Sequence, residues 1–261
     1  MSTVDLYATL ADLADVPLPP GLISQSLLRD EFAPPVAFMA LPLERAKSLH
    51  LLAGIELLED NAEIALSMMN EVLQLREPIL PPDHPDLAQA HERLGRAQFV
   101  LGQYRQAIAS QRRALAMTES APGSFAAIRV DMYASISNAF RRLGELQPQA
   151  QAAAQALTLA EALGDDEAAA EGIWAFAQAE ADGHRFDSAL RYLNRAVSAT
   201  AGGEAAPRFR AELLLARAEV LDALGRGEDA RRDSQYARGV LETAGDVDND
   251  VYRRASAWSD G

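Results

Sequence analysis

Apolar residues between positions 43 and 244 recur three and four apart, the spacing that places them on one face of an α-helix. These stretches come in pairs joined by a short turn, and a polar or proline-containing linker separates each pair from the next. The predicted pairs are 43–58 with 62–76, 85–101 with 104–119, 124–143 with 148–163, 166–182 with 186–200, and 207–224 with 228–244. The pattern therefore predicts an all-α chain.

The turn inside each predicted pair recurs at a fixed interval. Five turn positions, separated by 42, 42, 40 and 41 residues, are Asp60, Gly102, Gly144, His184 and Gly225. Glycine accepts the positive φ that ends a helix, and histidine tolerates that region better than most residues. A constant period of this length predicts five stacked copies of one helix pair.

Small residues also recur at fixed places within the helices of a pair. We expect Gly95 and Ala107 to face each other where two helices cross, because small side chains allow close approach. Ala114 would let the second helix pack against the next copy. The larger residues that would fill the space between layers are Leu94, Tyr104 and Leu115.

This spacing resembles the tetratricopeptide repeat, whose signature contains Leu-Gly, Gly-x-Tyr-x-x-Ala and Ala-Leu. The second copy matches at Leu94, Gly95, Gly102, Tyr104, Ala107, Ala114 and Leu115. The longer period and the Pro-Asp-His-Pro-Asp linker at 82–86 resemble the kinesin-light-chain-like variant. HEAT and armadillo repeats have a similar period, but the Gly-x-Tyr-x-x-Ala spacing disfavours them. The resemblance implies a right-handed α-α superhelical solenoid of about five antiparallel helix pairs.

Three regions are expected along the chain. Residues 41–244 form the repeat domain, with copies at about 41–80, 81–121, 122–164, 165–204 and 205–244. Residues 1–40 contain two short helical patterns, at 4–14 and 22–32, followed by a Pro-Pro linker. Residues 245–261 contain one more short helix. The ends of a solenoid need a different, more polar outer surface, so we expect both terminal regions to be caps. Alternatively, residues 1–40 lie along the groove.

Composition narrows the possible partners and the compartment. The formal net charge is −14, which argues against binding to nucleic acid or to an anionic membrane. The absence of cysteine suits a reducing compartment. The apolar stretch at 34–43 is broken by proline and is about half the ~20 residues of a membrane span. We therefore expect a cytoplasmic protein. Lys47 is the only lysine among 24 basic residues, a bias that indicates a GC-rich, bacterial genome.

Candidate chemistry is sparse. His84 and His91 lie near Asp83 and Asp86, but no third ligand has a metal-binding spacing, so we expect His84 to cap a helix. The sequence has no Gly-x-Ser-x-Gly elbow, phosphate-binding loop or paired-carboxylate motif. We expect no enzymatic activity, no metal site and no cofactor.

In tetratricopeptide repeats the first helix of each pair lines a concave groove, through positions about 13, 10, 6, 3 and 2 residues before the turn. Residues 91–145 carry eight arginines and four acidic residues, a balance of +4 that leaves −18 for the rest. The predicted partner-binding residues are Glu92, Arg96, Phe99, Asn138, Arg141, Arg142, Trp174 and Gln178. Arginine pairs well with carboxylates, and arginine and tryptophan are common hot-spot residues. We therefore expect the groove to bind an acidic or C-terminal segment. With Lys47 alone, the lysine-dependent clamp of chaperone-binding relatives cannot form.

These observations predict a non-catalytic scaffold or adaptor that binds a partner peptide or protein segment in its concave groove. One alternative is a peptide-sensing regulator that acts through a protein partner. Another is an accessory subunit of an enzyme encoded elsewhere. Direct DNA binding is disfavoured, because residues 1–40 hold only two short acidic helical patterns where DNA-acting sensors carry a helix-turn-helix. The sequence makes no prediction about the oligomeric state.

Overall fold

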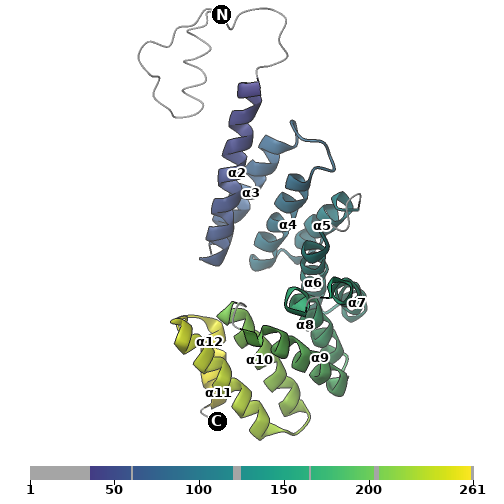
Figure 1. Ribbon diagram of the computed structural model, residues 1–261, viewed down its shortest axis with the longest axis vertical. Helices are drawn as coiled ribbons and strands as arrows, with labels where there is room; N and C mark the ends of the chain where they lie inside the picture. Colours follow the sequence, from purple (N-terminus) through teal and green to yellow (C-terminus); the bar gives the residue numbers. More distant parts are fainter. Residues whose placement is uncertain (1–35, 60, 120–124, 165, 203–205, 260–261) are drawn as a thin grey trace, which may run out of the picture.

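The computed structural model describes residues 36–59, 61–119, 125–164, 166–202 and 206–259. Over these ranges the chain is a right-handed superhelical stack of antiparallel helix pairs (Figure 1). The helices are α2 (Val36–Leu58), α3 (Ala62–Arg76), α4 (Pro85–Val100), α5 (Tyr104–Met117), α6 (Ala126–Arg142), α7 (Leu146–Leu163), α8 (Asp166–Asp182), α9 (Phe186–Ala199), α10 (Pro207–Ala223), α11 (Gly227–Ala244) and α12 (Asp250–Ser259). The predicted all-α solenoid is thus confirmed, and the ten helices of the repeats lie where the apolar spacing places them.

The first helix is the main difference from the predicted boundaries. Helix α2 begins at Val36, directly after Pro35, and continues through Pro42 and through the expected boundary at residue 40. The predicted helix begins only at residue 43. A proline removes one backbone hydrogen bond of a helix, but Pro42 does not end α2. The helices expected at 4–14 and 22–32 lie outside the described residues.

The turn positions adopt the backbone conformation that their residue types indicate. The φ angles are +73° at Gly102, +72° at Gly144 and +75° at Gly225, and 58° at His184. His184 is the only non-glycine residue with positive φ in the described part of the chain. Asp60, the fifth expected turn position, lies outside it.

Close helix contacts depend on small residues, but not in every case on the expected pair. A Cβ atom placed on Gly95 would lie 2.9 Å from Nε2 and 3.0 Å from Cγ of Gln111. The residue nearest to Gly95 is therefore Gln111, one helical turn beyond the expected Ala107. Gln111 is buried, and its Nε2 donates a hydrogen bond to the carbonyl oxygen of Glu92 at 3.1 Å.

A second close contact joins three helices. A Cβ on Gly172 of α8 would lie 2.7 Å from Cγ1 of Val130 on α6 and 2.9 Å from the carbonyl oxygen of Ala156 on α7. Gly172 was not selected in the sequence. The contact holds α8 close to the preceding pair, and with it the groove residues that α8 carries.

The two ends of the described solenoid differ. At the C-terminal end α12 packs on the last pair, where Val251 and Ala255 are buried and Ser234 Oγ donates to the carbonyl oxygen of Ala255 at 2.8 Å. At the N-terminal end α2 exposes several large apolar side chains, among them Leu51 and Ile55.

Candidate functional site: the concave groove

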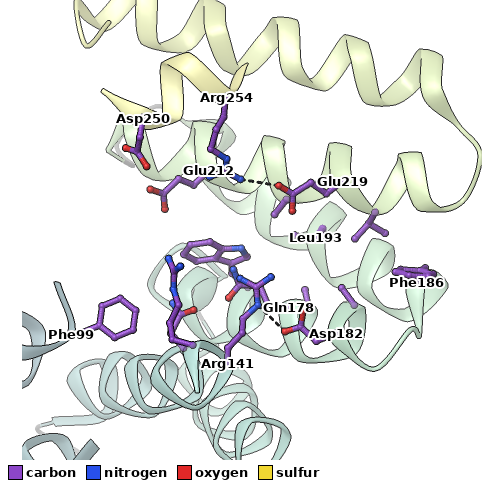
Figure 2. Close-up of a pocket in the computed structure, with 17 residues that line it drawn as sticks. Phe99, Arg141, Gln178, Asp182, Phe186, Leu193, Glu212, Glu219, Asp250 and Arg254 are labelled. Atoms are coloured by element: carbon purple, nitrogen blue, oxygen red, sulfur yellow. Dashed lines mark hydrogen bonds and ion pairs between the residues drawn. The ribbon is translucent and has the colours of Figure 1, made fainter. Parts of the chain in front are cut away.

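The first helices of successive pairs, together with α12, line two adjoining cavities of about 410 Å³ and 290 Å³. Four residues border both cavities: Phe99, Asn138, Trp174 and Glu212. The two cavities therefore form one continuous concave surface, which we call the groove. Figure 2 shows the larger cavity, with Phe99 and Arg141 on one side and Glu212, Asp250 and Arg254 on the other.

The structure places all eight predicted residues in this groove. The smaller cavity is lined by Glu92, Arg96, Phe99, Asn138 and Trp174. The larger cavity is lined by Phe99, Asn138, Arg141, Arg142, Trp174 and Gln178. They come together because neighbouring pairs stack with nearly the same orientation, so that residues about 40 apart in sequence lie side by side.

Arg141 already has a partner within the protein. Its Nε donates to Oδ2 of Asp182 at 2.7 Å (Figure 2). Nε2 of Gln149 donates to the same oxygen, also at 2.7 Å. Asp182 ends α8, whereas Arg141 lies in the last turn of α6. This carboxylate neutralises one of the two adjacent arginines. No ion pair of Arg142 is found among the described side chains.

Helix α12, which follows the last helix pair, also contributes charge to the groove. Arg254 Nη2 lies 2.8 Å from Oε1 of Glu219, and Arg208 Nη2 lies 3.2 Å from Oδ1 of Asp250. Both pairs join α12 to α10. The sequence analysis did not include α12 residues in the site, because this helix follows the last repeat and has no place in the periodic pattern.

A row of carboxylates follows the first helices along the smaller cavity. The members of this carboxylate row are Glu92 on α4, Asp131 on α6, Glu171 on α8 and Glu212 on α10. Burial raises the pKa of all four carboxyl groups. The pKa of Asp131 reaches about 7, because the groove walls exclude water and Glu171 and Glu92 add negative charge nearby. Its side chain is still open to solvent on one side.

Arg96 is a cation that acts on three members of the carboxylate row. It lowers the pKa values of Glu92, Asp131 and Glu171, but burial outweighs this effect for each of them. Its Nε is 3.9 Å from Oε1 of Glu92, at the outer limit for an ion pair. The smaller cavity is therefore short of positive charge, although the sequence predicted a basic mid-groove.

Three of the row members were absent from the predicted partner-binding residues, although a signal was present. Asp131 and Glu171 each lie 13 residues before the turn of their copy, the same offset as Glu212. That offset was among those expected to face the groove. The sum of charges over residues 91–145 is dominated by arginine and does not show the acidic residue that recurs at this offset in the third, fourth and fifth copies.

Aromatic side chains provide the apolar part of the groove. The rings of Phe99 and Tyr104 contact edge to face at 5.4 Å, and those of Trp174 and Phe209 at 5.5 Å. These contacts fix the orientation of both groove aromatics. The Trp174 Nε1 atom is buried and has no hydrogen-bond acceptor among the described residues.

The histidines of the linker region have structural contacts. His84 caps α4 as expected, since its Nδ1 accepts a hydrogen bond from the Asp86 backbone N–H at 3.1 Å. His91 is buried, and burial together with Arg113 lowers its pKa to about 4. In the part of the chain that the structure describes, no three His, Cys, Asp or Glu side chains are grouped as metal ligands would be. In the same part, every helix is too short or too polar to span a bilayer.

Comparisons with known proteins identify a matching repeat family and similar folds. A family model described as tetratricopeptide repeat matches residues 44–120. A search of curated proteins finds no match. Among solved structures, a Podosopora anserina putative kinesin light chain with nearly identical TPR-like repeats is 18% identical. It has a TM-score of 0.58, and the alignment covers 77% of this chain and 97% of that one.

Two proteins that were solved as complexes have similar folds. A Rap protein complexed with Competence and Sporulation Factor has a TM-score of 0.69 at 12% identity, over 81% of this chain and 57% of that chain. Bacillus thuringiensis PlcR, in complex with the peptide PapR7 and DNA, has a TM-score of 0.65 at 15% identity. That alignment covers 100% of this chain and 86% of PlcR. At these identities the likeness concerns the fold.

Proposed function

We propose that this chain, which is a tetratricopeptide repeat protein with helix pairs like those of kinesin light chains, is a non-catalytic protein that binds a segment of a protein partner in its groove. The observation that carries the proposal is the continuous concave surface formed by two adjoining cavities. Their combined lining contains aromatic rings, carboxylates and arginine. A groove of this kind suits an extended or helical peptide segment.

The charges in the groove define the chemistry of that segment. Burial, followed by repulsion from Glu171 and Glu92, raises the pKa of Asp131. The carboxylate row has more negative charge than Arg96 offsets, so a cationic side chain in the partner would compensate for both effects. Arg142, on the other side of Asn138, is available to an acidic side chain or a terminal carboxylate. We infer that the partner segment carries a basic residue opposite the carboxylate row and an acidic group near Arg142.

Peptide sensing through a protein partner is a second candidate function. It is supported by the likeness in fold to PlcR, which is bound to the peptide PapR7, and to the Rap protein, which is complexed with Competence and Sporulation Factor. The two candidates differ in the ligand: a free peptide for the sensor, and a segment of a larger protein for the adaptor.

Affinity capture from the native organism tests the proposal. The baits are the full-length protein, a Glu171→Gln/Glu212→Gln variant of the carboxylate row, and a Glu63→Gln control on the exposed side of α3. We expect the wild type and the control to retain a partner that the row variant loses. A synthetic peptide from that partner should then bind in calorimetric titration. A partner retained equally by all three baits would place the contact outside the groove.

A further inference from the structure

One face of α2 is apolar and exposed at the N-terminal end of the solenoid. Leu51 is 61% exposed, Leu52 46%, Ile55 50% and Leu58 79%. The spacing of these residues places all four on one side of α2, opposite the buried Ala46, His50 and Ala53 that face the next helices. We call these four residues the end face. A contiguous exposed apolar patch of this kind marks an interaction surface.

Two of these four positions are covered in the inner copies. Leu52 and Ile55 lie eight and five residues before the turn at Asp60, and the equivalent residues in the second copy are Leu94 and Ala97. Those two are 7% and 0% exposed. Both belong to one buried cluster with Met69 and Leu73 of α3, the second helix of the preceding pair. Ile136 and Ala139 in the third copy are buried in a cluster with Ile108 and Leu115 of α5. Leu52 and Ile55 thus belong to the surface that a preceding helix covers elsewhere, whereas Leu58 is equivalent to the groove residues Val100 and Arg142.

We propose that residues 4–14 of the same chain pack as an amphipathic helix on the end face. Their sequence, VDLYATLADLA, places Leu6, Leu10 and Leu13 on one helical face. From Leu6 to Leu13 this face extends about 11 Å at 1.5 Å per residue, the same length as the stretch from Leu51 to Leu58. The two apolar surfaces therefore match in length and in character.

The chain length permits this contact. Residues 15–35 connect the segment to Val36, and 21 residues can span up to about 70 Å when extended. The end face begins about 23 Å along α2 from Val36, since Leu51 is 15 residues further on. The connection contains Pro17, Pro19, Pro20 and Gly21, which separate the two helical patterns and allow the chain to reverse direction.

A cysteine pair tests the contact directly, because the natural chain has no cysteine. Leu10→Cys is combined with Ile55→Cys in the full-length protein, and the control combines Leu10→Cys with Leu146→Cys, an exposed site on α7. Under mild oxidation we expect the first pair to form an intramolecular disulfide several-fold faster than the control, at a rate independent of protein concentration. Since Ile55 is half exposed, the substitution leaves the helix packing intact.

Three results would overturn the proposal. Equal cross-linking of both pairs would mean that residues 4–14 do not occupy a fixed place. Faster cross-linking of Leu10→Cys to Ser135→Cys, a groove position, would place the segment in the groove. A covalent dimer of the Ile55→Cys single variant, with a dimeric mass in sedimentation, would show that a second copy covers the face. As an independent readout, Leu51→Gln/Ile55→Gln should remove hydrogen-exchange protection from residues 4–14, whereas Leu146→Gln should not.

Discussion

Arg141 and Asp182 lie 41 residues apart and are joined by an ion pair between equivalent ends of neighbouring first helices, with Nε 2.7 Å from Oδ2. Arg105 and Glu145, on α5 and in the turn before α7, are linked in the same way at 2.7 Å and are 40 residues apart. Charges that look free in one copy are thus neutralised by the next. Which arginine remains available to a partner depends on these pairs.

The two adjacent arginines should therefore respond differently to charge reversal. Arg142→Glu should weaken partner binding and reduce its salt dependence while leaving the melting temperature unchanged. Arg141→Glu should also lower stability by up to about 1 kcal/mol, because it removes a partly exposed pair and puts a carboxylate beside Asp182. Thermal melting and calorimetric titration separate the two effects. If the double reversal bound the native partner with wild-type affinity, the contact surface would lie elsewhere.

The carboxylate row should make stability fall as pH rises. The pKa of Asp131 is about 7 in the folded protein, above the value near 4 of an unfolded chain. The folded state therefore holds a proton that the unfolded state loses, and stability decreases between about pH 4 and pH 7. Asp131→Asn should add about 1 kcal/mol at pH 8, since solvent on the open side screens the repulsion. The gain should vanish near pH 4 in urea unfolding. If the stability gained by Asp131→Asn did not depend on pH, the raised pKa of Asp131 would not be its cause.

The buried histidines should make stability fall as pH decreases, the opposite of the effect of the carboxylate row. Burial and nearby arginines lower the pKa values of His50 and His91 to about 4, whereas an unfolded histidine titrates near 6.5. Their contribution to the free energy of unfolding is fully present above pH 6.5. It decreases by up to about 3 kcal/mol for each histidine as pH falls toward 4. His91→Gln should flatten this part of the stability curve. His184→Asn is the control, because His184 is exposed and asparagine tolerates its positive φ.

Two helical glycines provide a matched test of packing. Gly172→Ala should destabilise by about 1–3 kcal/mol, because the new methyl group would meet Val130 and the backbone of Ala156. Gly239→Ala should stabilise by up to about 1 kcal/mol, since nothing lies within 4 Å of its Cβ position and alanine favours the helix. Denaturant unfolding of both variants gives the comparison. Equal effects of the two substitutions would show that the three-helix contact tolerates a methyl group.

The sequence predicted the parts of this molecule that depend on local chemistry. Turn glycines, the His84 cap and the apolar spacing act within a few residues, so the helices and the stack could be predicted from them. The groove positions followed from the repeat resemblance, which supplied offsets from each turn. Neither the local signals nor the repeat resemblance shows which side chains form ion pairs between copies, as Arg141 does with Asp182.

The electrostatic character of the groove was harder to predict because it is cumulative. One acidic residue per copy, such as Glu171, is ordinary in a chain of net charge −14. The effect arises when stacking places four of them along one cavity and reduces the water around them. A sum of charges over residues 91–145 cannot show this, since it mixes groove residues with those on the outer surface.

Trp174 gives the groove an optical signal of its own. The chain has two tryptophans, and the other, Trp258, lies on α12 against the buried cluster of Ala218, Leu221 and Ala230. The indole of Trp174 borders both cavities beside the carboxylate row, where its emission responds to local charge and to water. A segment entering the groove would shift the emission of Trp174 and leave that of Trp258 as a constant background. Occupancy could thus be followed in the unlabelled protein.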